Sequence, residues 1–268
     1  MVTGCGHPEV GRMKMPTLFI GHGSPMNAIE KNAFTDLLVT LPARFEKPKA
    51  ILVVSAHWET RGSQVLKALR PETIHDFGGF PKELFAVQYR PPGAPEVADK
   101  ILQLLQHHGV RTSTSWGLDH GAWSILKHMY PQADVPVLQL SLNRDFSLEQ
   151  HLEFAKDLGG LRELGILILG SGNVTHNLRL IDWRPGAPVM GWAQEFDQMI
   201  KSALENRDEK VLLAKENGAQ WNQAHPSLEH YIPLLYAYGA TGPTEKIEFI
   251  FESIEMGSLS MRSFLVSA

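Results

Sequence analysis

The chain has 268 residues, of which 43% are apolar and 20% are charged, and its formal net charge is -4. This length and composition are sufficient to bury one large core, so we expect a single domain. The weak negative charge gives no broad basic surface, which argues against nucleic acid or an anionic membrane as a partner and favours a small molecule.

Residues 1–15 contain several glycines and lack the continuous apolar run of a signal peptide. We therefore expect a flexible N-terminal extension, followed by one domain over residues 16–268. The only cysteine, Cys5, excludes an internal disulfide and fits a reducing, cytoplasmic location. No apolar run reaches the length that is needed to cross a bilayer.

The rest of the chain alternates between apolar runs and amphipathic stretches, which predicts an α/β domain. The runs are rich in Ile, Val and Leu over their full length, as expected for a mostly parallel central sheet with helices on both faces. The predicted strands are residues 17–21, 50–56, 64–69, 136–142, 165–170 and 246–251. The predicted helices are residues 27–40, 94–107, 121–130, 148–164, 188–205 and 227–238.

Three of these strands lead into polar, glycine-bearing segments that contain a histidine. His22 and His57 follow the first two strands, and His176 follows the strand at 165–170. In open α/β sheets the ligand crevice lies beyond the carboxyl ends of the strands, so these side chains should converge on one cleft. Because neutral imidazole is the commonest transition-metal ligand, His22 and His57 are predicted to bind a metal.

A third ligand is available near the start of the predicted helix at 227–238. With Ser227 as the N-cap, Glu229 and His230 would both fall in the first turn, about 100° apart around the helix axis. Only one of the two is expected to face a given metal, and the residues alone leave both open.

The remaining histidines fall into two groups. His120 and His176 occur in glycine-bearing turns, where functional and purely structural roles are both open. His75 lies in the segment 73–81, which is either a substrate-facing lid or a rigid turn shaped by its two adjacent glycines. Histidines in helical, polar surroundings are expected on the surface; these are His107, His108, His128 and His151.

Several other chemistries find no support in the motifs. The glycine-bearing segments Gly21–Ser24 and Gly170–Asn173 lack the spacing of a nucleophile elbow or a P-loop. Cys5 lies in the expected extension, away from any formed site. Serine hydrolase, nucleotide-dependent and thiol chemistry are therefore not expected.

Several motifs occur in one order between about Pro16 and Met261 and together resemble a known enzyme family. They are Gly21-His22-Gly-Ser-Pro-Met, Ala56-His57-Trp, His75-Asp-Phe-Gly-Gly-Phe-Pro, Gly117-Leu-Asp-His120-Gly-Ala-Trp, Gly172-Asn-Val-Thr-His176-Asn, Glu229-His230-Tyr and Ile254-Glu-Met-Gly-Ser-Leu-Ser-Met261. This set resembles the class III extradiol ring-cleaving dioxygenases of the LigB type. Within that class it is most similar to the 4,5-DOPA extradiol dioxygenase branch of bacteria and plants.

The resemblance implies a non-haem metal centre, normally Fe(II), that holds a catechol and O₂ side by side. By motif, His22, His57 and His230 would be its ligands. The wider class has a glutamate as the third ligand, whereas the DOPA-type branch has a histidine there. An all-histidine site also binds Zn(II) well, so zinc is expected to compete for the same place.

The resemblance also implies roles around the metal. His176 matches the family's catalytic histidine, which exchanges a proton with the catechol and is in addition a candidate fourth ligand. His120 matches a catalytic-site histidine that contacts the substrate near the ring to be cut. Trp58 and Phe80 are expected to wall the ring, and His75 to orient it.

Two functions of other classes also fit a histidine-rich crevice. One is a zinc-dependent hydrolase, in which a metal-bound water attacks a carbonyl. The other is a non-catalytic binding protein on the same scaffold, because fold does not fix function. The acid/base histidine expected at His176 argues against the binding protein, which has no need of a proton carrier.

Overall fold

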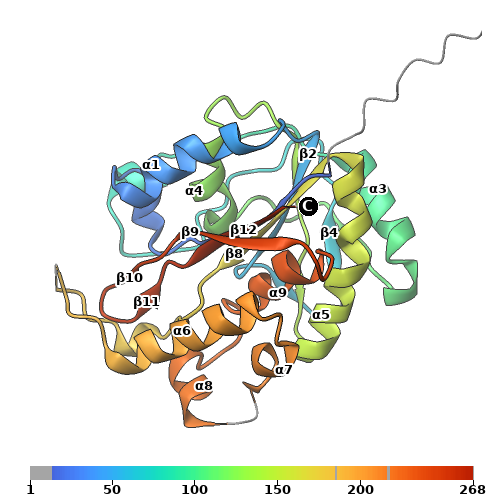
Figure 1. The fold of residues 1–268 in the computed structure, drawn as a ribbon. Coiled ribbons are helices and arrows are strands. Elements are labelled where there is room, and N and C mark those ends of the chain that lie inside the picture. The colour runs from blue at the N-terminus through green and yellow to red at the C-terminus, as the bar shows by residue number, and fades with distance from the viewer. Residues whose placement is uncertain (1–13, 185, 216–217, 268) are drawn as a thin grey trace, which may run out of the picture.

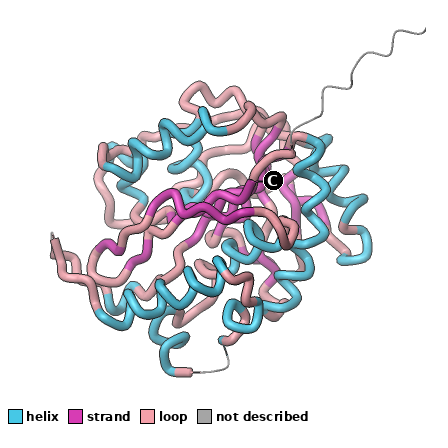
Figure 2. The backbone as a smooth tube through the Cα atoms, in the orientation of Figure 1, coloured by secondary structure: helices cyan, strands magenta, loops and turns pink. Residues whose placement is uncertain are grey.

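The computed structural model describes residues 14–184, 186–215 and 218–267. Its strands are β1 Thr17–Gly21, β2 Ala50–Ser55, β3 Glu59–Thr60, β4 Gln64–Leu66, β5 Arg111–Ser113, β6 Val137–Gln139, β7 Leu142–Asn143, β8 Ile166–Gly172, β9 Lys246–Phe251, β10 Ile254–Glu255, β11 Leu259–Ser260 and β12 Ser263–Ser267. Its α-helices are α1 Ala33–Thr40, α2 Lys82–Phe85, α3 Pro95–Leu104, α4 His120–Met129, α5 Leu148–Asp157, α6 Gly191–Glu205, α7 Glu209–Leu212, α8 Ala219–Ala224 and α9 Ile232–Gly239. Strands gather at the centre and helices surround them (Figure 2).

The central sheet has six strands in the order β6, β2, β8, β1, β12, β9. Neighbours from β6 to β1 are parallel, whereas β12 is antiparallel to both β1 and β9. The predicted α/β domain with a mostly parallel sheet is therefore confirmed, and one reversed strand makes the sheet mixed. The sequence analysis missed β12 because its apolar run, Phe264 to Val266, is only three residues long.

Three other predicted elements differ from the structure. Strand β4 leaves the central sheet and pairs with β5, and the run predicted at 136–142 divides into β6 and β7. The helix predicted at 148–164 ends as α5 at Asp157 and continues as a 3-10 helix from Leu158 to Leu164. Two adjacent glycines, Gly159 and Gly160, explain this end, because glycine weakens an α-helix.

Helices cover both faces of the central sheet, with α1 and α4 on one side and α5 and α9 on the other (Figure 1). The strands β1, β2 and β8 are buried over their whole length, which accounts for their continuous apolar sequences. Helix α9 packs so closely on β8 that a Cβ atom at Gly170 would lie 2.2 Å from the carbonyl oxygen of Pro233. Glycine is thus required where this helix crosses the sheet.

The parallel strands end together at one edge of the sheet. Gly21 of β1 lies opposite Gly172 of β8, and Ser55 of β2 lies opposite Ser171. The residues that follow these positions therefore emerge side by side, as predicted from the sequence.

The first residues of the chain are described only in part. Most of the expected extension, residues 1–13, lies outside the described residues. Met15 is 4% exposed, and its backbone exchanges two hydrogen bonds with Arg162, at 3.1 Å and 2.7 Å. Met15 therefore belongs to the folded part. Among the helices that the structure describes, none combines the length and apolar character needed to span a membrane.

Candidate active site

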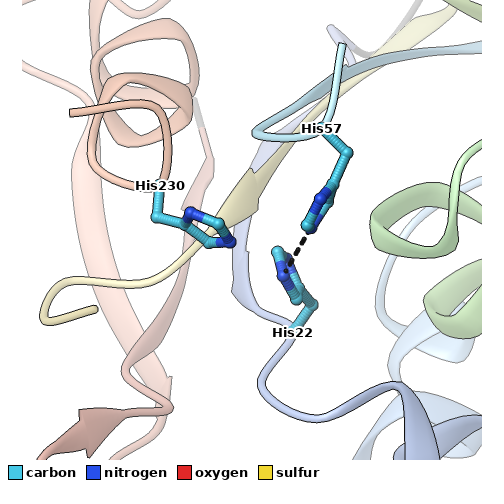
Figure 3. A group of neighbouring side chains, drawn as sticks. All are labelled: His22, His57 and His230. Atoms are coloured by element: carbon cyan, nitrogen blue, oxygen red, sulfur yellow. Dashed lines mark hydrogen bonds between the residues drawn. The ribbon is translucent and has the colours of Figure 1, made fainter. Parts of the chain in front are cut away.

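Three imidazoles from distant parts of the chain converge at the carboxyl edge of the sheet. His22 follows β1, His57 follows β2, and His230 lies in the turn before α9; their rings point toward one another (Figure 3). One nitrogen from each ring lies within 4.8 Å of the others. The Nε2 atoms of His22 and His57 are 3.2 Å apart.

The hydrogen bonds behind His22 define which of its nitrogens carries the proton. Its Nδ1 lies 2.9 Å from the hydroxyl oxygen of Ser171. That hydroxyl donates its own proton to the carbonyl oxygen of Gly121, 2.6 Å away, so toward His22 it acts as an acceptor. The proton of His22 is therefore assigned to Nδ1, and Nε2 keeps its lone pair.

For the other two rings, a carboxylate lies next to Nδ1. Nδ1 of His57 lies 3.2 Å from a carboxylate oxygen of Asp76, and Nδ1 of His230 lies 3.0 Å from one of Glu229. A carboxylate only accepts, so both rings carry their proton on Nδ1. The three Nε2 lone pairs face one another with no proton between them, an arrangement that a cation stabilises.

The donor set fits a transition-metal ion. Two ligands about 2.1 Å from one ion lie roughly 3.0–3.4 Å apart, a range that includes the separation of the His22 and His57 nitrogens. Burial, followed by repulsion from neighbouring imidazoles, lowers the pKa of His57 to about 3. The same two causes hold the pKa values of His22 and His230 well below the ordinary value of 6.5. All three rings are neutral near pH 7, the state that binds metals.

The turn that carries His230 begins differently from the sequence prediction. Helix α9 starts at Ile232 and not near Ser227, so Glu229 and His230 lie before the helix rather than in its first turn. The later start puts Pro233 in the first turn, where the missing N–H of proline costs nothing. Glu229 then lies behind the ring of His230 and not beside it in the cluster.

Strand β8 holds this turn in place. The backbone N–H of Asn173 donates to the carbonyl oxygen of His230 at 2.8 Å. A Cβ atom at Gly172 would lie 2.1 Å from that same oxygen, so only glycine permits the approach. The glycines after β8 that marked the motif in the sequence thus bring the third histidine to the other two.

His176 lies against this cluster on the segment that follows β8. Its ring stacks on that of His230, with centroids 3.4 Å apart and planes 7° from parallel. Its backbone N–H donates to the carbonyl oxygen of Ala224, which fixes the segment. Burial lowers the pKa of His176 to about 4, so the ring is a neutral base near pH 7.

His120 is the first residue of α4 and also faces the cluster. Asp119 caps this helix and is itself held by the Ser55 hydroxyl at 2.6 Å, so the start of α4 is fixed against β2. Both the backbone N–H and Nδ1 of His120 lie 2.9 Å from Asp76. The ring of His120 is therefore oriented by the same carboxylate that holds His57.

Asp76 is a functional residue that the sequence analysis did not single out, since it was considered only as part of the segment 73–81, either a lid or a turn. Burial alone would raise its pKa, but the hydrogen bonds from His120 and the electrostatic attraction of the neighbouring imidazoles outweigh burial and lower it. Its carboxylate stays anionic, accepts from the backbone N–H and Nδ1 of His120, and lies 3.2 Å from Nδ1 of His57. The only sequence signal is general: a carboxylate often supports a metal-binding histidine.

A cavity of about 240 Å³ opens onto the histidines. It includes the expected ring wall Phe80, but neither Trp58 nor His75 lines it. Trp58 is 3% exposed and stacks on Trp116, with ring centroids 5.5 Å apart. The Nε2–H of His75 donates to the carbonyl oxygen of Val87 at 3.0 Å. The geometry therefore gives these two residues structural contacts and does not support the substrate contacts expected of them.

Three of the four histidines expected on the surface are at least partly buried, and only His107 is exposed; the ring of His108 packs against that of Phe154. His151 is 1% exposed and contacts the Tyr236 hydroxyl at 3.0 Å, so the expectation is wrong for this residue. His128 is partly buried, and its Nε2 lies 2.8 Å from the carbonyl oxygen of Asn27. Both residues lie in helices of largely polar sequence, from which the side that packs against the core could not be identified.

Comparison with known proteins gives the class of this protein. Residues 17–263 match the family described as the catalytic LigB subunit of aromatic ring-opening dioxygenase. The chain therefore belongs to the LigB family and is a ring-opening dioxygenase of the extradiol type, which confirms the fold and family expected from the sequence.

Individual relatives agree with this class. The chain is 43% identical to "4,5-DOPA dioxygenase extradiol" of Escherichia coli (strain K12), over 93% of this chain and 94% of the relative. It is 40% identical to the protein of the same name from Beta vulgaris, over 92% and 95% of the two chains. A solved structure of an uncharacterized protein from Escherichia coli K12 superimposes with a TM-score of 0.83 at 38% identity, covering 95% of this chain and 100% of that one.

Proposed function

We propose that this enzyme opens the ring of a DOPA-like catechol with O₂ next to the two hydroxyls, at an Fe(II) ion held by His22, His57 and His230. The observation that carries the proposal is the set of three Nε2 lone pairs, each freed by an acceptor on Nδ1. The names of the relatives support the catechol and the extradiol cleavage.

The metal supplies one kind of chemistry when bound: it brings catechol and O₂ together and makes the catechol hydroxyls more acidic. Fe(II) is proposed as the working ion because ring opening with O₂ needs a metal that exchanges electrons. Zn(II) suits the same imidazoles but is redox-inactive, so it would fill the site without supporting turnover.

The chain's own residues then handle the protons and the ring. His176, neutral near pH 7, accepts a proton from a catechol hydroxyl and returns it after the ring opens. Its stacking on His230 supports this proton role over that of a fourth ligand, because parallel stacked rings direct their nitrogen lone pairs along separate lines.

His120 and Phe80 position the catechol. His120 faces the cavity with Nδ1 held by Asp76, so its Nε2 is free to contact a substrate oxygen. The Asp76 carboxylate compensates positive charge on that ring if it takes up a proton. Phe80 provides an apolar wall for the aromatic ring.

The proposal extends to the chain as a whole. Residues 16–268 act as one catalytic domain, supported by the family match over 17–263. The single cysteine supports a reducing, cytoplasmic setting.

Anaerobic reconstitution tests the function directly. Metal-free protein is loaded with Fe(II) or with Zn(II) in parallel, mixed with a catechol, and then exposed to O₂ while oxygen uptake and a coloured ring-opened product are recorded. We expect one O₂ consumed per catechol opened with Fe(II), and none with Zn(II). Ester or amide hydrolysis by the zinc form, without oxygen uptake by the iron form, would replace the proposal with a hydrolase.

A further inference from the structure

The ring of His176 is held differently from the four other imidazoles that line the cavity. The Nδ1 atoms of His22, His57, His120 and His230 each lie against an acceptor. Among the hydrogen bonds of the described residues, none reaches a ring nitrogen of His176, whose ring stacks on that of His230. A group that exchanges protons with a substrate needs a free nitrogen, so the position of this ring has to be set through its backbone.

The backbone around His176 belongs to no helix or strand. Residues 173–177 follow β8 and lead into the 3-10 helix at Leu178–Leu180. Polar backbone groups outside regular elements need other partners, and in this segment two neighbouring parts of the chain supply them. One is the antiparallel hairpin of β10 and β11 (Figure 1), and the other is the turn after α8.

Thr175 ties the segment to the hairpin. Its side chain is fully buried, and its hydroxyl donates to the carbonyl oxygen of Ser258 at 2.5 Å and accepts from the backbone N–H of Ser260 at 2.9 Å. The hairpin is itself fixed on α6, because the Ser260 hydroxyl donates to Asp197 at 2.6 Å and Nε of Arg262 donates to the same carboxylate oxygen at 3.0 Å. Thr175 thus connects the residue before His176 to a rigid support.

His225 ties the same segment to the turn after α8. Its ring is 2% exposed, and its Nε2–H donates to the carbonyl oxygen of Val174 at 2.7 Å. The preceding residue, Ala224, accepts the backbone N–H of His176 at 3.0 Å. Neither Thr175 nor His225 lines the cavity, so both side chains act on the site through the backbone alone.

We infer that Thr175 and His225 are positioning residues for His176: they fix the backbone that places its ring beside the catechol, without contact with substrate or metal. This inference rests on the proposed function. Displacement of a reacting group by about 1 Å can lower the rate roughly a hundredfold. Loss of either side chain should therefore affect kcat far more than bound metal or KM.

Two substitutions at Thr175 test the inference. Thr175→Val keeps the branched shape and loses the hydroxyl, whereas Thr175→Ser keeps the hydroxyl. With the Fe(II)-loaded enzyme and a catechol, we expect Thr175→Val to lower kcat about 10- to 100-fold, with bound metal and KM near the wild-type values. Thr175→Ser should retain most of kcat.

Thr17→Val is the matched control for general loss of stability. Thr17 is as fully buried as Thr175, and its hydroxyl donates to the carbonyl oxygen of Ala237 at 2.7 Å. It lies at the end of β1 remote from His22. Both valine variants should lower the melting temperature, because each leaves a buried carbonyl oxygen without its donor, but only Thr175→Val should lower kcat.

NMR of the zinc-loaded protein follows the ring of His176 without turnover. Stacking on His230 places the carbon-bound ring protons of His176 in a ring current that shifts their resonances upfield. His176→Ala identifies these resonances by their loss. Thr175→Val should move them downfield, toward the values of an unstacked imidazole, whereas Thr175→Ser and Thr17→Val should leave them in place.

A second pair of variants approaches the segment from the other side. His225→Gln keeps a side-chain N–H that is able to donate toward Val174, and His225→Leu removes the donor. We expect kcat to fall more in His225→Leu than in His225→Gln, again with bound metal retained. If Thr175→Val does not fold, this pair decides the question.

The possible outcomes are distinct. Wild-type kcat and unchanged resonances in Thr175→Val overturn the inference and leave the proposed function intact, as does an equal loss of kcat in Thr17→Val. Loss of metal in Thr175→Val also overturns it, because the segment would then support the ligand His230, whose carbonyl oxygen it binds through Asn173. Absence of ring opening in the wild type overturns the proposed function instead.

Discussion

Two histidine clusters of this protein contain similar residues but differ in which ring nitrogen, Nε2 or Nδ1, lies against a hydrogen-bond acceptor. Away from the sheet edge, the exposed His107 and the partly buried His108 direct Nε2 at one oxygen of Asp157, at 3.1 Å and 2.8 Å. Both nitrogens donate to a carboxylate whose pKa is lowered chiefly by the bond from His108. In the cluster at the sheet edge, the acceptors lie next to Nδ1, on the side of each ring away from the converging Nε2 atoms.

This difference decides what each cluster can bind. In the cluster of His107, His108 and Asp157 the proton occupies the nitrogen that a metal would need. At the sheet edge, burial keeps the rings neutral and the hydrogen bonds leave the converging nitrogens free. The position of the acceptor, rather than the number of histidines, therefore decides which cluster can bind a metal.

The largest effect should come from removing one of the three proposed metal ligands. His57→Ala should reduce bound metal from about one ion per chain to nearly none and abolish turnover, because only two of the three ligands remain. His108→Ala is the matched control from the cluster of His107, His108 and Asp157, and it should retain both bound metal and turnover. Metal content after Fe(II) reconstitution and desalting is the measurement. Stoichiometric metal in His57→Ala would remove this residue from the ligand set.

Removal of the stacked ring should affect protons more than metal. His176→Ala should lower kcat roughly a hundredfold to ten-thousandfold, the usual worth of a positioned acid/base, while bound metal stays near the wild-type level. Parallel metal analysis and single-turnover kinetics distinguish the two roles. Loss of metal as complete as in His57→Ala would instead identify His176 as a ligand.

His151 tests whether burial alone keeps a histidine neutral, because it lies outside the metal cluster. Burial lowers its pKa from 6.5 to about 4. As pH falls, the imidazole therefore becomes protonated in the unfolded chain before it does in the folded one. The contribution of neutral His151 to the free energy of unfolding is complete above about pH 6.5 and is lost as pH falls toward 4. At 1.36 kcal/mol per pKa unit the loss amounts to about 3 kcal/mol.

Urea unfolding between pH 7.5 and 4.5 measures this loss. His151→Gln keeps a polar partner for Tyr236 but does not titrate, so its stability should fall less steeply with acid than that of the wild type. Equal slopes for the two proteins would show that His151 does not contribute.

Asp76 tests the value of an acceptor behind the rings. Asp76→Asn should weaken metal binding or turnover about 10- to 100-fold, since the amide can donate toward Nδ1 of His57 and disturb the proton arrangement. Asp157→Asn, which alters the surface carboxylate, should leave both unchanged. Metal affinity is measured by competition with a chelator, and kcat is measured on the same preparations. A fall in either quantity in Asp76→Asn indicates that Asp76 orients the rings.

The smallest effect is expected in the segment 73–81, proposed from the sequence as a lid. Phe77 and Phe80 of this segment line the cavity. Gly78 has no atom within 4 Å of a Cβ built on it, so Gly78→Ala fits the folded chain and only stiffens it. A lid predicts a several-fold fall in kcat with a higher KM at unchanged melting temperature. Unchanged kinetics would mean a rigid turn.

Gly79 supplies the contrast for that experiment. Its φ of 79° lies in the left-handed region, where alanine is strained. Gly79→Ala should therefore lower the melting temperature whether or not the segment moves, which makes Gly78→Ala the informative variant.

An element of the fold is predicted from the sequence more accurately when its run of apolar residues is long. Strand β1 has the predicted bounds, and β2 differs by one residue, because long Ile, Val and Leu runs are read without knowledge of their neighbours. Strand β12 was missed because three apolar residues carry too little pattern. The predicted start of α9 was too early because it relied on Ser227 as an N-cap. Pro233, which favours the first turn of a helix, indicated the later start.

For the site, sequence by itself determined which histidines follow the buried strands and, through the ordered motifs, the family. The tertiary structure decided what those residues face. It put His230 rather than Glu229 toward His22 and His57, and it brought Asp76 to rings 19 and 44 positions away along the chain. It buried Trp58 against Trp116 and bound the partly buried His75 to the carbonyl oxygen of Val87. The physical reason is that strand ends are set by local apolar runs, whereas ring orientation and protonation depend on acceptors that only packing brings together.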